Sequence, residues 1–168
     1  PLGVVAGVLP WNFPFFLIAR KMAPALVTGN TVVIKPSEET PLNAYLFAEL
    51  LSQTDLPKGV FNLVGGRGRT TGEALISHPG IDLITFTGSV ETGSHIMQVA
   101  GRNLTKVNLE LGGKAPAIVL KDADLDLAAQ AIHASRVINT GQVCNCAERV
   151  YVEREVHDAL VEKLAALF

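Results

Sequence analysis

Short apolar runs alternate with longer helical patterns along this chain, and this alternation constrains its fold more than any other feature. The runs are rich in β-branched residues, as strands buried on both faces of a parallel sheet tend to be. They cover residues 4–9, 31–34, 60–64, 81–86 and 107–111. Repeated β-α-β units of this kind predict an α/β fold with a doubly wound, mostly parallel, Rossmann-like sheet.

The clearest helical pattern follows the second run. We expect Thr40 to cap this helix and Pro41 to occupy its first position, where a missing N–H costs nothing. The apolar side chains expected on its buried face are those of Leu46, Phe47, Leu50 and Leu51.

A glycine pair, Gly112 and Gly113, separates these repeats from the rest of the chain. Beyond the pair, strands are expected at residues 115–120 and 149–153, and helices at residues 125–138 and 156–167. Because a glycine pair after a strand often serves as a hinge, we expect two domains. Residues 1–112 would form the first, an incomplete Rossmann-like domain, and residues 113–168 the start of a second α/β domain.

Composition limits the kind of partner. With 48% hydrophobic and 18% charged residues in a chain of 168, a globular protein can bury a real core. The net charge is −2 without any block of like charges, so we expect neither nucleic acid nor a membrane surface as a partner. The most apolar stretch, residues 15–19, is far too short to span a bilayer. A small molecule is the favoured partner.

Cysteine use and the start of the chain bear on its context. Two cysteines and no secretory signal pattern favour a reducing compartment, with the cytoplasm as the default. The chain begins at Pro1 and enters an apolar run at once, which is typical of an excerpt. We therefore expect an internal part of a longer protein, with segments missing at both ends.

Cys144 and Cys146 lie in the loop before the last predicted strand. A structural zinc site needs four ligands, and the sequence offers neither a second cysteine pair nor histidines at ligand spacing, so no metal is predicted. Ring strain and the reducing compartment disfavour a disulfide between them. Two interpretations stay open: both are buried small apolar side chains, or Cys144 is a reactive thiol displayed by a loop after Gly141.

Polar residues follow the carboxyl ends of two predicted strands, at the edge where doubly wound sheets bind ligands. Asn12 follows the first strand, where its amide could donate to an oxyanion or simply form a turn. Lys35 and Glu38 end the second strand and suit a nucleotide. A carboxylate accepts both ribose hydroxyls and repels a 2′-phosphate, which favours NAD over NADP. The alternative is a solvated surface turn.

Two further strand ends carry candidate residues. Gly88 and Gly93 would let the backbone approach a pyrophosphate beside free helix N–H groups. This stretch matches neither Gly-x-Gly-x-x-Gly nor a phosphate-binding loop, so the pattern alone is weak. Glu110 stands between leucines, and desolvation by them would raise its pKa toward the range of a general base. The alternative is a strand-end glutamate paired with a neighbouring lysine.

Five motifs occur in a specific order along the chain. They are Trp-Asn-Phe-Pro at 11–14, Lys-Pro-Ser-Glu at 35–38, Phe-Thr-Gly-Ser at 86–89 with Gly93 beyond it, Leu-Glu-Leu-Gly-Gly at 109–113 and Gly-Gln-Val-Cys at 141–144. In this order and spacing the chain resembles the NAD(P)-dependent aldehyde dehydrogenase superfamily over essentially its whole length. Residues 141–149 look most like the lactaldehyde and glycolaldehyde dehydrogenase branch.

The resemblance implies catalytic roles for four residues. Cys144 would attack the aldehyde carbon, while Asn12 and the Cys144 backbone N–H would hold the oxyanion. After hydride transfer to NAD, Glu110 would activate water to hydrolyse the thioester, so the product would be a free acid. Lys21 would assist proton movement. Cys146 would give structural support. Residues 1–112 would then be part of the NAD-binding domain, and residues 113–168 would be the N-terminal part of the catalytic domain that carries the nucleophile.

The resemblance also implies binding roles. Lys35 and Glu38 would hold the adenosine ribose, Ser89 the pyrophosphate, and Gly68 the side of the adenine. The full set of implied cofactor contacts is Trp11, Lys35, Ser37, Glu38, Gly68, Gly88, Ser89, Gly93 and Leu111. The implied substrate contacts are Phe13, Phe16, Arg20 and Val143. An arginine at position 20 suggests a small, polar aldehyde such as lactaldehyde, and the parent protein is expected to be a homodimer or homotetramer.

Two other functions compete with aldehyde oxidation to an acid. A non-catalytic NAD-binding module would bind the cofactor without forming NADH. A coenzyme A-acylating aldehyde dehydrogenase would pass the acyl group to coenzyme A, and Glu110 disfavours it because such relatives lack this carboxylate.

Overall fold

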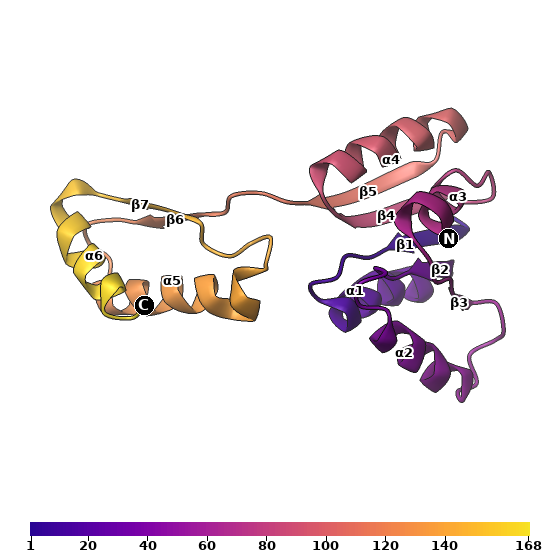
Figure 1. Cartoon of the computed structure of the whole chain (residues 1–168), viewed down its shortest axis with the longest axis horizontal. Helices are drawn as coiled ribbons and strands as arrows, with labels where there is room; N and C mark the ends of the chain where they lie inside the picture. The colour runs from indigo at the N-terminus through magenta and orange to yellow at the C-terminus, as the bar shows by residue number, and fades with distance from the viewer. The chain divides into compact units, whose positions relative to one another are not determined.

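The computed structural model describes all 168 residues, which form two compact units, Pro1–Leu111 and Gly112–Phe168 (Figure 1). The division falls beside the glycine pair, one residue before the boundary expected from the sequence. Each unit has its own hydrophobic core, and the two are described separately below.

The first unit is built on a five-stranded parallel sheet with the order β3-β2-β1-β4-β5. Its strands are β1 (Val4–Val8), β2 (Thr31–Lys35), β3 (Phe61–Leu63), β4 (Leu83–Gly88) and β5 (Lys106–Leu111). The strand order reverses between β1 and β4, which is the arrangement of a doubly wound sheet. The predicted fold class is therefore confirmed.

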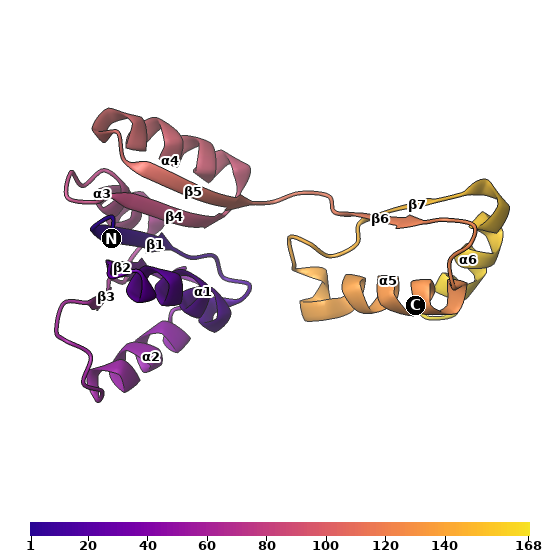
Figure 2. The same cartoon turned by 180° about the vertical axis from the view of Figure 1, so that it is seen from behind.

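Helices cover both faces of this sheet (Figures 1 and 2). The helices α1 (Pro14–Val27) and α2 (Leu42–Ser52) pack on one face. The short π-helix η1 (Gly68–Gly72), α3 (Glu73–Ile76) and α4 (Val90–Asn103) follow β3 and β4, and the other face packs mainly against α3 and α4. Side chains alternate between the two cores because successive strand residues point to opposite faces: Val5 packs toward α1, whereas Ala6 packs toward α4.

The prediction for α2 is wrong in two respects. The Thr40 hydroxyl does not cap the helix; it donates to the Trp11 carbonyl oxygen at 3.2 Å, and α2 begins at Leu42 without a side-chain cap. Leu46 and Leu50, expected on the buried face, are 60% and 62% exposed. Ala44 is the fully buried residue, because the face that meets the sheet lies about one side chain further round the helix.

The second unit contains a two-stranded parallel sheet of β6 (Pro116–Val119) and β7 (Arg149–Val152). Its helices are α5 (Leu125–Val137), the 3₁₀ turns η2 (Ile138–Gly141) and η3 (Arg154–Val156), and α6 (His157–Ala165). Asp124 caps α5 by accepting from the N–H groups of Asp126 and Leu127. The core of this unit is small and consists of Val119, Ala129, Ile132 and Leu160. None of the helices in either unit has the length and apolar character needed to cross a bilayer.

Candidate functional site

The carboxyl edge of the first unit's sheet carries most of the predicted site residues. Trp11, Asn12 and Phe13 follow β1, and Ser37 and Glu38 follow β2. Gly68 begins the turn after β3, Gly88 ends β4 with Ser89 next, and Glu110 and Leu111 end β5. Because parallel strands end at one edge, the fold brings these residues to the same side of the unit.

Lys35, Glu38 and Gly68 form a polar cradle at the ends of β2 and β3. The buried Lys35 Nζ donates to the Pro36 carbonyl oxygen at 2.9 Å and lies 3.5 Å from Glu38 Oε2. The Gly68 N–H donates to Glu38 Oε1 at 3.4 Å. The pKa of Glu38 is lowered, first by its own backbone N–H and then by the Gly68 N–H and Lys35. A charged carboxylate at this edge can accept the two hydroxyls of a ribose.

Ser89 caps the N-terminus of α4. Its hydroxyl oxygen accepts from the Thr92 N–H at 3.1 Å, which leaves the other N–H groups of the first turn available to an anion. Gly93 has a packing role that was not predicted from the sequence. The position is buried, and a Cβ there would lie 2.6 Å from Leu111 Cδ2. Gly93 therefore lets the end of β5 pack closely against α4.

Lys21 is the most unusual charged residue of this unit. It lies on the buried face of α1 with only 6% of its surface exposed, and its Nζ donates to Thr85 Oγ1 at 3.0 Å. The pKa of Lys21 is lowered from 10.5 to about 8, mainly by burial and then by the adjacent Arg20, while Glu110 opposes this shift. A lysine of this kind exchanges its proton near neutral to mildly alkaline pH.

Glu110 lies near Lys21 but is not desolvated by its leucine neighbours as expected. Its side chain is 50% exposed, and Oε1 lies 3.7 Å from Arg20 Nη2. Leu109 and Leu111 pack into the core on the opposite face, because neighbouring residues of a strand point in opposite directions. The charged partner of Glu110 is Arg20, which was expected to face the substrate. It is not a neighbouring lysine, which was the alternative considered from the sequence.

Thr85 and the Thr87 side chain were not among the site residues predicted from the sequence. They occupy alternate positions of β4, whose other residues are mostly apolar, and this Thr-x-Thr pattern was the available signal. Thr87 pairs in register with Glu110. Its hydroxyl oxygen is buried and has no hydrogen-bond partner in the chain, so a bound ligand could supply one.

The predicted substrate residues of α1 are mainly on its exposed side. Phe16 is exposed and meets the half-buried Phe13 edge to face, with 6.3 Å between ring centroids. Arg20, one turn further along the helix, is exposed apart from its contact with Glu110. These side chains offer an aromatic and cationic surface next to the loop of Trp11, which is itself partly exposed.

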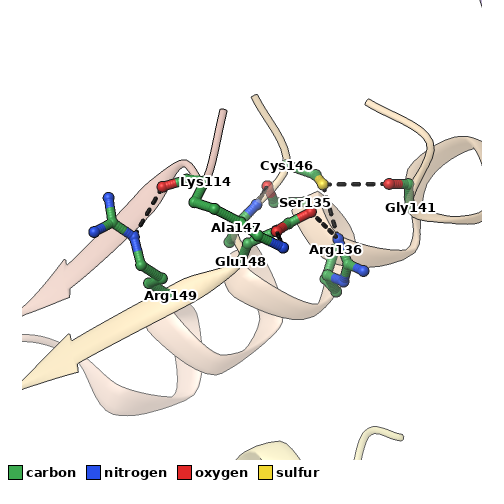
Figure 3. Close-up of polar contacts among 8 residues, drawn as sticks. All are labelled: Lys114, Ser135, Arg136, Gly141, Cys146, Ala147, Glu148 and Arg149. Atoms are coloured by element: carbon green, nitrogen blue, oxygen red, sulfur yellow. Dashed lines mark hydrogen bonds and ion pairs between the residues drawn. The ribbon is translucent and has the colours of Figure 1, made fainter. Parts of the chain in front are cut away.

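Cys144 and Val143 belong to the second unit, in the loop between η2 and β7. Cys144 is exposed and Cys146 is buried, and both are free thiols. Figure 3 shows how Cys146 is held: Arg136 Nη1 donates to its Sγ at 3.0 Å, and the Sγ donates to the Gly141 carbonyl oxygen at 3.4 Å. The Cys146 thiol thus connects the segment after Cys144 to Gly141, which precedes it, and holds the loop in place.

Further contacts tie the same loop to the start of the unit (Figure 3). The Ala147 N–H donates to Ser135 Oγ at 3.0 Å, and Glu148 pairs with both Lys114 and Arg136. The hydrogen bond from Lys114, followed by the charge of Arg136, lowers the pKa of Glu148. No group of three or more His, Cys, Asp or Glu side chains is placed to hold a metal ion.

The strand order places the first unit in the doubly wound α/β class, with its polar residues at the edge where that class binds ligands. The sequence profile of the aldehyde dehydrogenase family matches residues 1–168, and the chain belongs to this family. Members of the family use NAD(P). The predicted family resemblance is therefore confirmed.

Individual relatives agree with this assignment. The chain is 64% identical to lactaldehyde dehydrogenase from Escherichia coli strain K12 over 163 residues, which cover 97% of this chain and 34% of that protein. A crystal structure of lactaldehyde dehydrogenase from Escherichia coli superposes with a TM-score of 0.96 at 63% identity, covering 98% of this chain and 35% of the other. A crystal structure of an E. coli NADP-dependent enzyme gives a TM-score of 0.96 at 46% identity, over 99% and 34% of the two chains. The chain thus spans about a third of the length of these relatives.

Proposed function

We propose that the protein containing this chain oxidises a small aldehyde of the lactaldehyde or glycolaldehyde type to its carboxylic acid, with NAD as hydride acceptor. The observation that carries the proposal is the grouping of Lys21 and Arg20 of α1 with Glu110 of β5, in a chain of the aldehyde dehydrogenase family. This grouping combines a proton-exchanging base, a cation for a polar substrate and a carboxylate that can activate water.

The proposed nucleophile is Cys144. Its exposed thiolate would attack the aldehyde carbon and form a thiohemiacetal, whose developing oxyanion would be stabilised by the Asn12 amide and the Cys144 backbone N–H. NAD, when bound, accepts a hydride from this carbon. Glu110 would then remove a proton from water as the water attacks the resulting thioester, releasing the acid and the thiol.

Lys21 would accept and release the protons that move during this reaction. Its amine lies within the first unit's core beside Thr85, where its pKa of about 8 lets it accept and return a proton at little cost near neutral pH. The contact between Arg20 and Glu110 supports a substrate with a hydroxyl or carboxylate, because the guanidinium can donate to such a group while the carboxylate stays close.

The cradle fits NAD. Lys35 and Glu38 would hold the adenosine ribose, Gly68 would lie beside the adenine, and the first turn of α4 after Ser89 would take the pyrophosphate. The pKa of Glu38 is lowered, so its side chain would present a negative charge to the adenosine ribose and would repel the 2′-phosphate of NADP, which favours NAD. One solved relative, at 46% identity, is an NADP-dependent enzyme, and a comparison of kcat/KM for the two cofactors tests the preference of this chain.

The test uses the full-length protein with lactaldehyde and NAD, with and without coenzyme A. We expect NADH and free lactate to form in equal amounts, and Cys144→Ala to abolish both. Peptide mass spectrometry after brief alkylation should show Cys144 modified much faster than Cys146, with a rate that changes when NAD is added. NAD binding without NADH would contradict the proposal in favour of a non-catalytic module, and an acyl-coenzyme A product would indicate the acylating reaction.

A further inference from the structure

One row of residues crosses the sheet of the first unit beneath α1. Gly7 of β1 pairs in register with Thr85 of β4, and Thr85 pairs with Asn108 of β5. On the other side, Gly7 pairs with Ile34 of β2. The row therefore places an apolar residue, a glycine, a hydroxyl and an amide side by side on one face.

The glycine of this row lies beside the stem of Lys21. A Cβ at Gly7 would lie 2.5 Å from Ile34 Cδ1 and 3.7 Å from Lys21 Cδ, so an added methyl group would displace the end of Ile34 and would be in ordinary van der Waals contact with the lysine stem. With Gly7 in place, Lys21 reaches Thr85 from α1 and its Nζ donates to the hydroxyl oxygen at 3.0 Å. The stem of Lys21 thus runs beside the Gly7 position on its way to Thr85.

The hydroxyl of Thr85 is oriented by its other neighbour. It lies 3.4 Å from Asn108 Oδ1, which can only accept a hydrogen bond, so the Thr85 hydrogen points toward Asn108. The Thr85 oxygen then presents its lone pairs to Lys21, which must be the donor. Thr85 is buried in a strand otherwise rich in apolar residues, so a hydroxyl there is costly unless it has such partners.

We infer that Thr85, oriented by Asn108, is a positioning residue that holds the amino group of Lys21 as a hydrogen-bond donor in the proposed aldehyde oxidation. This inference rests on the proposed function for its place in the reaction, but the contact itself is a property of the first unit. Within the first unit the Thr85 hydroxyl bonds to Lys21 and Asn108, so Thr85 would act through Lys21.

The charged groups that act on Lys21 come from two elements. Arg20 on α1 favours its neutral form and Glu110 on β5 favours its charged form. The residues beside it on β1 and β2, Gly7 and Ile34, are not titratable. Within this environment the Thr85 oxygen is the hydrogen-bond acceptor that faces the amine directly.

The first arm of the test measures the pKa of Lys21 by NMR of its ε-carbon in the full-length protein, a measurement that does not depend on activity. Thr85→Val removes the hydroxyl at nearly constant volume, and we expect the pKa to fall by about one unit because the charged amine loses its acceptor. Thr85→Ser should restore it. Thr31→Val, which makes the same chemical change at the start of β2, is the matched control and should leave the pKa unchanged.

A second variant keeps the pKa measurement decisive if Thr85→Val does not fold. Asn108→Leu frees the Thr85 hydroxyl to donate to the neutral amine, so the pKa of Lys21 should again fall. Asn108 lies on an exposed part of β5, where substitution is tolerated more easily. A Lys21 pKa that is the same in the wild type and in the folded variants would overturn the inference.

The second arm measures kcat against pH for aldehyde oxidation by the full-length protein. Thr85→Val should shift the limb governed by Lys21 to lower pH with little change in KM for the aldehyde, and Thr85→Ser should shift it back. If the pKa of Lys21 changes but the pH profile of kcat does not, Thr85 positions Lys21, and the role proposed for Lys21 in turnover is contradicted. If the wild type does not oxidise aldehydes at all, the proposed function fails while the first arm still decides the contact.

Discussion

Two lysines are buried against the same sheet, and their partners differ. Lys35 at the end of β2 donates to a carbonyl oxygen and lies 3.5 Å from the carboxylate of Glu38, so its charge is balanced by a group that can also bind a ribose. Lys21 meets the neutral hydroxyl of Thr85, with another cation, Arg20, next to it in the chain. The first arrangement suits binding, and the second suits a group that gives up and regains a proton.

The largest expected effect comes from removing the second lysine. Lys21→Met should lower kcat for aldehyde oxidation about a hundredfold or more, as is typical for loss of a positioned acid–base group. Lys35→Met should instead raise KM for NAD and leave kcat at saturating NAD much less affected. Steady-state kinetics with both variants of the full-length protein would test the contrast, and equal kcat losses would remove it.

The stability of the chain should depend on pH through Lys21. Below about pH 8 the lysine is protonated in both folded and unfolded states, and above about 10.5 it is neutral in both. Between these values only the unfolded state holds the proton, so the free energy of unfolding rises with pH, by about 3 kcal/mol for a shift of about 2.5 units.

Urea denaturation of the 168-residue chain at pH 7.5 and pH 10 measures this rise. Lys21→Met should abolish most of it and should stabilise the chain at the lower pH, because an apolar side chain removes the cost of burying the charge. Lys35→Met provides the matched comparison. A rise that survives in Lys21→Met would show that another group causes it.

The choice between NAD and NADP tests the binding role assigned to Lys35 and its partner Glu38. Glu38→Gln removes the charge but keeps the shape of the side chain, so we expect kcat/KM for NADP relative to NAD to increase about tenfold as repulsion of the 2′-phosphate is lost. The pKa of Lys21 should not respond. An unchanged cofactor ratio would mean that Glu38 does not lie near the adenosine ribose.

The smallest effect should come from Arg20. Arg20→Gln removes the cation that disfavours charged Lys21, so the pKa of Lys21 should rise by a fraction of a unit. The shift should shrink in added salt, because Arg20 is well exposed. NMR titration of the Lys21 ε-carbon provides the measurement. A fall in the pKa would show that Arg20 does not lower the pKa of Lys21 in the wild type.

The repeated β-α-β pattern was sufficient to predict the sheet of the first unit. Its β-branched runs differ clearly from the sequences between them, and the rules for parallel connections leave few arrangements. The helix α2 was harder, because apolar residues occur on nearly all sides of it and the pattern gives little contrast. The exposed Leu46 and Leu50 show that periodicity cannot select a face when most positions are apolar.

The candidate site was predicted in part. Strand ends identified Lys35, Glu38 and Ser89, because their position at the edge follows from the order of elements alone. The row of Gly7, Thr85 and Asn108 was not predicted, since it depends on the register between strands that are far apart in sequence. The environment of Glu110 was misjudged for the same kind of reason: its nearest neighbours in sequence lie on the other face of the sheet.

Gly7 has a consequence for how substitutions would be tolerated. It lies buried next to the carboxyl end of the central strand, where a single added methyl group would overlap Ile34 and come into van der Waals contact with the stem of Lys21. Any larger side chain would also have to displace that lysine. A deep mutational scan selecting for turnover should therefore find this interior position as intolerant as a residue that touches substrate. Selection for folded protein alone should be more permissive there, since Ile34 can repack around a small side chain.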